Sequence, residues 1–122
     1  MEIIHAKVAY ADTLLAEYEM HHSLFEKMIR HFNKKVKEEA MAGFQTCFVL
    51  WKEFDIDEAY ATDCEATAEL LSSIIGAGYE AVFCYNGPNI SNPCGIVVGW
   101  GPEANECIED FFQHSKNLFK GE

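Results

Sequence analysis

Residues 4–43 read IHAKVAYADTLLAEYEMHHSLFEKMIRHFNKKVKEEAMAG, with no proline and no glycine before Gly43. Along this segment apolar or aromatic residues recur at steps that alternate between four and three. They are Ile4, Val8, Ala11, Leu15, Tyr18, Phe25, Ile29, Phe32 and Val36, and His22 takes the one remaining position of the series. This pattern is a heptad seam, which predicts an α-helix that packs along another helix.

The length of this helix raises a question about where it packs. A straight helix over these residues would be about 60 Å long, whereas a domain of this size has a radius of gyration of only about 14 Å. The helix must therefore break or extend to a partner subunit. Ser23-Leu24-Phe25-Glu26 has the pattern of a capping box, at which a second helix could begin, but the seam continues through it in the same phase.

We therefore expect one long or slightly kinked helix that ends at Gly43 and forms a homo-oligomer through its seam. The predicted interface residues are Leu15, Tyr18, His22, Phe25, Ile29 and Phe32.

The rest of the chain predicts a small antiparallel sheet and two further helices. Residues 44–51 are β-branched or aromatic and apolar on both faces, as in a central strand. Residues 79–85 and 94–100 predict a hairpin with a long loop, because the residues between them are almost all turn formers. Helices are expected over 63–76, with Ala68, Leu71, Ile74 and Ile75 facing inward, and from Pro102 to about Phe119. The sequence thus predicts a single α+β domain over residues 1–122, with three strands in the order α-β-α-β-β-α.

Charge is distributed unevenly along the chain, whose net charge is −11. Residues 53–110 contain no lysine or arginine. Their acidic residues are Glu53, Asp55, Asp57, Glu58, Asp63, Glu65, Glu69, Glu80, Glu103, Glu106, Glu109 and Asp110. Such a segment repels nucleic acid and anionic lipid. It is either a solvated face or a surface that competes with DNA for a basic protein.

Sequence motifs for catalysis and metal binding are missing. There is no G-x-S-x-G, phosphate loop or H-E-x-x-H. The spacing of the histidines and of the five cysteines does not suit a metal site or a disulfide framework, so we expect buried, reduced thiols and no metal or cofactor. The chain has neither a signal-peptide pattern nor an apolar run long enough to span a bilayer, so a cytoplasmic protein is expected.

The segment from Asn86 to Asn92 is the most specific feature of the C-terminal half. Its asparagines offer amide donors and acceptors, and aromatic residues lie in the flanking strands, a combination that suits a nucleobase. A rigid loop whose amides satisfy only local backbone groups is the alternative. Phosphates would need cations such as Arg30 from the long helix of another subunit. The predicted ligand residues are Phe83, Asn86, Asn89, Asn92, Trp100 and Arg30.

Short motifs occur at Ile4-His5-Ala6-Lys7, Ala40-Met41-Ala42-Gly43, Gly78-Tyr79 and Ile96 to Trp100. Through these motifs the chain resembles small bacteriophage and prophage proteins, many of which act against host defences. The loop from Phe83 to Asn92 is similar to the ligand loop of the Thoeris anti-defence sponges, oligomers that sequester cyclic nucleotide signals without cleaving them. This resemblance implies a stacking role for Phe83 and an amide contact from Asn92.

Three functions remain open at this point. The first is a non-enzymatic sponge for a nucleotide-type immune signal, such as a cyclic ADP-ribose isomer or a cyclic dinucleotide, in a pocket shared between subunits. The second is an acidic inhibitor, of the anti-CRISPR or DNA-mimic type, that binds a basic host defence protein. The third is a small hydrolase or lyase without a sequence signature. Direct binding to nucleic acid or membrane is not expected.

Overall fold

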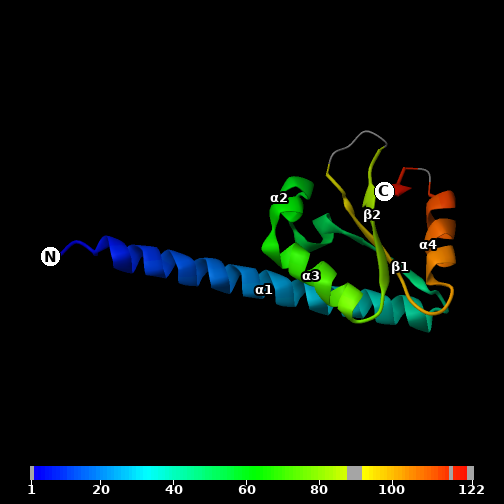
Figure 1. Ribbon diagram of the computed structural model, residues 1–122, viewed down its shortest axis with the longest axis horizontal. Helices are drawn as coiled ribbons and strands as arrows, with labels where there is room; N and C mark the ends of the chain where they lie inside the picture. Colours follow the sequence, from blue (N-terminus) through cyan, green and yellow to red (C-terminus); the bar gives the residue numbers. More distant parts are fainter. Residues whose placement is uncertain (1, 88–91, 116, 121–122) are drawn as a thin grey trace.

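The computed structural model describes residues 2–87, 92–115 and 117–120, and these form an α+β fold (Figure 1). Its helices are α1 Ala6–Met41, the 3₁₀ helix η1 Trp51–Phe54, α2 Glu58–Asp63, α3 Glu65–Gly76 and α4 Ala104–Gln113. Its strands are β1 Thr46–Leu50, β2 Glu80–Tyr85, β3 Gly95–Gly99 and β4 Phe119–Lys120. The predicted fold class is confirmed.

The four strands form one antiparallel sheet in the order β1-β3-β2-β4. The expected hairpin is confirmed as the β2–β3 pair, in which Glu80 lies opposite Gly99. The prediction that 44–51 is a central strand was wrong, because β1 lies at the edge and β3 occupies the centre. β3 is buried along its whole length. A Cβ on Gly95 would lie 2.1 Å from the Val49 carbonyl oxygen, so glycine permits the close approach of β1.

The last helix is shorter than predicted, and a fourth strand follows it. α4 ends at Gln113, and Phe119–Lys120 then pairs with the end of β2. Tyr85 lies opposite Phe119. The expected helix through Phe119 was therefore wrong, because the chain turns back to cover the open edge of β2.

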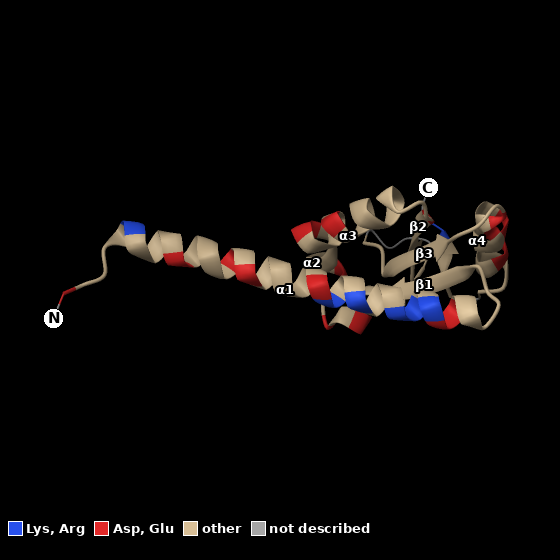
Figure 2. Cartoon of the chain, turned by 90° about the horizontal axis from the view of Figure 1, so that it is seen from below, with Lys and Arg blue, Asp and Glu red and all other residues tan. Residues whose placement is uncertain are grey.

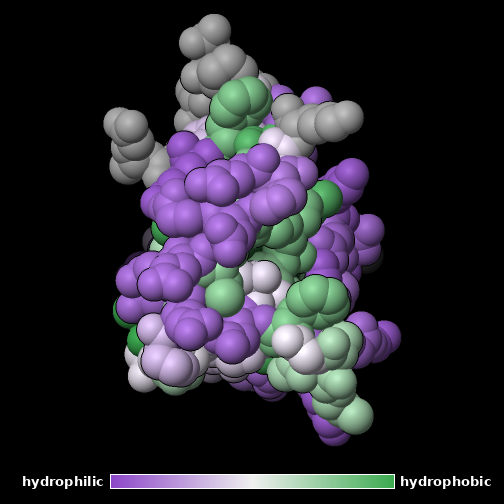
Figure 3. Space-filling model, turned by 90° about the vertical axis from the view of Figure 1, so that its right-hand side faces the viewer, coloured by the Kyte–Doolittle hydropathy of each residue, from purple (hydrophilic) through white to green (hydrophobic). Residues whose placement is uncertain are grey.

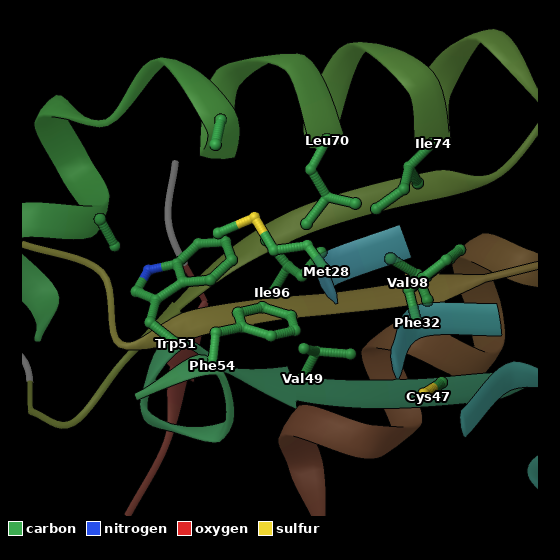
Figure 4. Packing of buried hydrophobic residues seen from close by; sticks show 12 residues of the cluster. Met28, Phe32, Cys47, Val49, Trp51, Phe54, Leu70, Ile74, Ile96 and Val98 are labelled. Carbon is green, nitrogen blue, oxygen red and sulfur yellow. The ribbon is translucent and has the colours of Figure 1, made fainter. Parts of the chain in front are cut away.

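Helices cover both faces of the sheet (Figure 1). On one face, Met28 and Phe32 of α1 and Leu70 and Ile74 of α3 pack over the strands and over Trp51 of η1 (Figure 4). On the other face Ile108 of α4 packs against Val97, Cys84 and Cys94. The α3 prediction was partly wrong: its buried residues are Ala66, Thr67, Leu70 and Ile74, whereas Ala68 and Ile75 are exposed.

α1 is a single helix of 36 residues, about 54 Å long, and it continues through Ser23 without a break. It ends as the sequence predicts. Gly43 has φ of 93°, the Phe44 N–H donates to the Glu39 carbonyl, and the Gly43 N–H donates to the Ala40 carbonyl. These bonds form a Schellman motif, in which glycine adopts the left-handed conformation at little cost.

The seam of α1 divides into two parts. From Leu24 to Val36 its apolar residues pack against the chain's own core. Every described residue from Glu2 to Met20 is exposed, and this half of α1 projects from the body (Figure 1). Within the described residues, no helix is long and apolar enough to cross a membrane.

Candidate functional site

A cavity of about 190 Å³ lies between η1, α2, α3 and the β2–β3 hairpin. We call it the Trp51 cavity. Its lining residues are Trp51, Ala61, Thr62, Thr67, Ala68, Leu71, Phe83, Tyr85 and Pro93. A cavity of about 150 Å³ with apolar walls holds a benzene molecule, so this one has room for a single planar ring system.

Two residues that line the Trp51 cavity each have a buried polar atom without a hydrogen-bond partner among the described residues. Trp51 and Thr67 are 1% and 4% exposed, and neither Trp51 Nε1 nor Thr67 Oγ1 has a hydrogen-bond partner among the described residues. The indole nitrogen points away from Met28 and Ile96 (Figure 4). A buried polar group without a partner costs about 1–3 kcal/mol. The indole N–H can only donate, whereas the threonine hydroxyl can donate or accept, so the cavity suits a ligand with hydrogen-bond acceptors.

Aromatic side chains form the wall of the cavity on the sheet side. Phe83 and Tyr85 are separated by one residue in β2, so their side chains lie on the same face of the sheet. Phe83 is 40% exposed although it borders the cavity. Its ring is therefore available to stack on a planar group that enters from solvent.

Trp51 is held in place by hydrogen bonds at both ends of η1. The backbone N–H of Trp51 donates to the Cys94 carbonyl at 2.9 Å. Glu53 anchors the rest of the turn on α1: its carboxylate accepts the Leu50 N–H at 2.7 Å and lies 2.7 Å from His31 Nε2 and 2.9 Å from Lys35 Nζ. Burial alone would raise the pKa of Glu53, but these hydrogen bonds and the charge of Lys35 outweigh it, so its pKa lies below the usual value.

A second and larger cavity, of about 510 Å³, lies beside the ends of the hairpin strands. We call it the loop cavity. Its lining residues are Leu50, Lys52, Ile56, Asp57, Glu58, Ala59, Asn86, Asn92 and Cys94. Asn86 Nδ2 donates to Glu58 Oε1 at 3.0 Å, and Asp57 Oδ1 accepts the Tyr60 N–H as the cap of α2. Lys52 is the one cation among these lining residues, against the carboxylates of Asp57 and Glu58, so the loop cavity is on balance acidic.

The structure separates the predicted ligand residues. Phe83 borders the Trp51 cavity, and Asn86 and Asn92 border the loop cavity. Asn89 lies outside the described residues. Trp100 follows the far end of β3, where its ring packs edge-on against Tyr79 with centroids 6.0 Å apart, so it does not flank the loop. Arg30 is exposed on α1 and borders neither cavity.

Sequence reasoning missed Trp51 and Thr67, which define the cavity. Trp51 ends the apolar run 44–51, which predicts a strand, and nothing in that run indicates a cavity. Thr67 is a clearer sign of the cavity than Trp51, because Thr67 is the only polar residue among the four that α3 buries. A hydroxyl on the inner face of an apolar helix requires a hydrogen-bond partner.

The predicted interface residues occupy two environments. Leu15 and Tyr18 are 57% and 64% exposed, and His22 is exposed and stacks on Tyr18. Phe25 and Ile29 pack partly on the chain's own core, and Phe32 is buried in it. Phe32 is therefore a core residue of the single chain.

Several of the acidic residues have partners within the chain. Asp55 pairs with Lys27 at 3.0 Å, Glu69 with His21 at 2.6 Å, and Glu109 with Lys120. Acidic residues also line α4, whereas the basic ones gather on the half of α1 that underlies the sheet (Figure 2). The end of the molecule at α4 is largely hydrophilic, with hydrophobic side chains exposed between (Figure 3).

All five cysteines are free, as predicted, although Cys64 and Cys107 are only half-buried. Cys84 and Cys94 bring their sulfurs within 3.7 Å without a bond. Burial raises the pKa of the Cys47 thiol to about 11 and also raises the pKa of Cys84 and Cys94, so the neutral thiol predominates at all three. No cluster of metal-ligating side chains occurs within residues 2–87, 92–115 and 117–120.

A comparison of this chain with protein-family models, curated proteins and solved structures finds no significant match. The resemblance to anti-defence sponges therefore stays a prediction.

Proposed function

We propose that this protein is a non-enzymatic binding protein that sequesters a small nucleotide-type ligand, with one base of the ligand in the Trp51 cavity. One observation carries the proposal: Trp51 and Thr67, whose Nε1 and Oγ1 atoms are buried without a hydrogen-bond partner among the described residues, both line the same aromatic cavity. Ring nitrogens or carbonyl oxygens of a base can accept hydrogen bonds from both groups. Its planar face can stack on Phe83.

The size and charge of the site define the ligand further. Pockets for drug-sized ligands measure about 300–1,000 Å³, so a cavity of about 190 Å³ takes one base and leaves the rest of the ligand outside. Asn86, Asn92 and Lys52 of the loop cavity offer amides and a cation, and each of them is adjacent in sequence to a residue that lines the Trp51 cavity. Because Asp57 and Glu58 lie beside them, phosphates would need further cations. We therefore propose that a second subunit supplies these, so that the pocket is shared.

We place this activity in the cytoplasm of a phage-infected bacterial cell, as counter-defence by removal of a cyclic ADP-ribose isomer or cyclic dinucleotide. The resemblance of the loop from Phe83 to Asn92 to that of anti-defence sponges supports this assignment. The aromatic cavity at the foot of the same loop supports it independently.

The test is thermal stabilisation by a panel of nucleosides, cyclic ADP-ribose isomers and cyclic dinucleotides. We expect at least one to raise Tm and to be recovered intact, by mass spectrometry, after heat release. Phe83→Ala removes the stacking ring and should weaken binding by roughly 5- to 150-fold, since stacking is worth about 1–3 kcal/mol. Thr67→Val keeps the shape of the side chain and should weaken binding by roughly 2- to 12-fold.

Phe119→Ala is the matched control, because Phe119 is 41% exposed, close to the 40% of Phe83, and does not border the cavity. It should leave affinity unchanged. The proposal is wrong if no member of the panel shifts Tm at saturation, or if Phe83→Ala and Thr67→Val bind as well as the wild type. Recovery of altered ligand would indicate an enzyme instead.

A specific observation also favours the acidic inhibitor. α4 and its N-cap expose Glu103, Glu106, Glu109 and Asp110, and only Glu109 pairs with a described lysine. Such a helix is complementary to a basic groove. The inhibitor function predicts that this protein competes with DNA for a basic DNA-binding enzyme and that Glu103→Gln with Glu106→Gln weakens the competition. Competition that persists unchanged at about half-molar salt would argue against it.

A further inference from the structure

The exposed half of α1 carries a row of large apolar side chains that the body leaves uncovered. Val8, Leu15, Tyr18 and Met20 are between 52% and 67% exposed. Isolated helices of about 15 residues are marginal in water, and a helix this apolar gains stability when another surface covers it. The seam residues Ile4, Val8, Ala11, Leu15, Tyr18 and His22 lie along this half, with the spacing of a helix that packs on a helix.

We propose that the occupant is the same segment of a second copy of this chain, in antiparallel orientation. In this register Val8 faces Tyr18 of the second copy, and Ala11 faces Leu15. Both of these layers combine a smaller side chain with a larger one, which fills space evenly. In a parallel pair Ala11 would face Ala11 and Tyr18 would face Tyr18, which leaves a gap at one layer and crowds another.

A groove at the root of the projecting helix receives the N-terminal turn of the second copy. It has a volume of about 610 Å³ and lies where α1 meets α3. Its lining residues are Leu14, Glu17, Tyr18, His21, His22, Phe25, Glu26, Glu65 and Glu69. The antiparallel register brings Ile4 of the second copy to His22, within this groove.

The charges of the groove and of the arriving helix end are complementary. The groove carries the carboxylates of Glu17, Glu26, Glu65 and Glu69. The first turn of α1 contains Lys7 and no acidic residue, and a helix N-terminus carries a partial positive charge. A parallel pair would place Lys7 beside Lys7 and leave the groove without its cation. Lys7 of the second copy lies beside Glu65 and Glu69, away from the Trp51 cavity. This interface therefore does not supply the cations of the proposed shared pocket and does not rest on the proposed ligand.

The first experiment measures mass in solution by light scattering after gel filtration. We expect a dimer for the wild type and a monomer for Leu15→Asp, because a carboxylate would be buried between the helices. Ile75→Asp is the matched control: Ile75 is 62% exposed, against 57% for Leu15, and lies on α3 outside the seam. It should remain dimeric. A monomeric wild type, or a Leu15→Asp variant that stays dimeric, would overturn the proposal.

The second experiment determines orientation by disulfide trapping. Val8→Cys and Tyr18→Cys variants are oxidised alone and as a mixture, and the wild type gives the background from the native cysteines. The antiparallel dimer predicts a covalent product mainly in the mixture. A parallel dimer would instead trap each variant alone, and that result would refute the proposed register.

Discussion

Glu53 shows how one side chain positions the candidate site. Its carboxylate ties the turn that carries Trp51 to His31 and Lys35 of α1. In the sequence it is one of twelve acidic residues in a segment without cations, and nothing distinguishes it from a surface residue. Its role depends on the packing of α1 under η1, which joins residues 18 positions apart.

Replacement of Glu53 by glutamine should destabilise the fold in a pH-dependent manner. The pKa of Glu53 is lower in the folded chain than in the unfolded one. The ionised form therefore contributes stability above the unfolded pKa of about 4.3, and this contribution is lost as pH falls through the folded value. We expect Glu53→Gln to lower the free energy of unfolding by about 1–3 kcal/mol near neutral pH, and by much less at an acidic pH below the folded pKa.

Urea unfolding of both proteins at the two pH values measures this difference. Glu80→Gln is a suitable control, because Glu80 is exposed at the start of β2. A destabilisation by Glu53→Gln that does not shrink in acid would show that the carboxylate charge is not the cause.

At the scale of elements, the sequence predicted what depends on local chemistry. The end of α1 followed from Gly43, and the β2–β3 hairpin from the turn formers between its strands. The edge position of β1 was not predictable, because residues 46–50 are covered on both faces and their pattern is that of a central strand. The buried face of α3 was misassigned since Ala66, Leu70 and Ile74 form one apolar stripe and Leu71 and Ile75 border it. Only packing against the sheet determines which of these neighbouring apolar positions are buried.

Three glycines test the backbone requirements of these elements separately. Gly95→Ala should be severely destabilising, because its Cβ would lie 2.1 Å from the Val49 carbonyl oxygen and force β1 away from β3. Gly43→Ala meets no neighbour within 4 Å but keeps φ of 93°, so we expect a loss of about 1 kcal/mol. Gly76→Ala has open space and is the last residue of α3, so it should stabilise by roughly 0.4–1 kcal/mol.

Denaturant unfolding of the three variants, followed by tryptophan fluorescence, measures this order. The reading of the sheet is wrong if Gly95→Ala unfolds at the wild-type midpoint. A Gly43→Ala variant as stable as Gly76→Ala would argue against the left-handed cap of α1.

At the scale of the whole molecule, one uninterrupted seam packs on the chain's own core in its C-terminal half and is exposed in its N-terminal half. The sequence predicted a helix that packs along its full length, and the periodicity gave no sign of where the body ends. The structure places that boundary near Leu24, where α1 begins to pack on its own core. The candidate site was predicted to a similar extent: Phe83 could be identified from its place beside the loop, whereas Trp51 and Thr67 required the packing of η1, α2 and α3 around one cavity.

The two halves of α1 should differ in amide hydrogen exchange, and only one half should depend on protein concentration. Residues 24–36 pack on the body, so their amides should stay protected at every dilution. Residues 6–20 are exposed in the single chain, and a helical segment of that length frays readily without a partner. We expect these amides to be protected in concentrated protein and to exchange much faster on dilution or in Leu15→Asp. If residues 6–20 stayed protected in a verified monomer, the projecting helix would be stable by itself, and the apolar seam would no longer require a second chain.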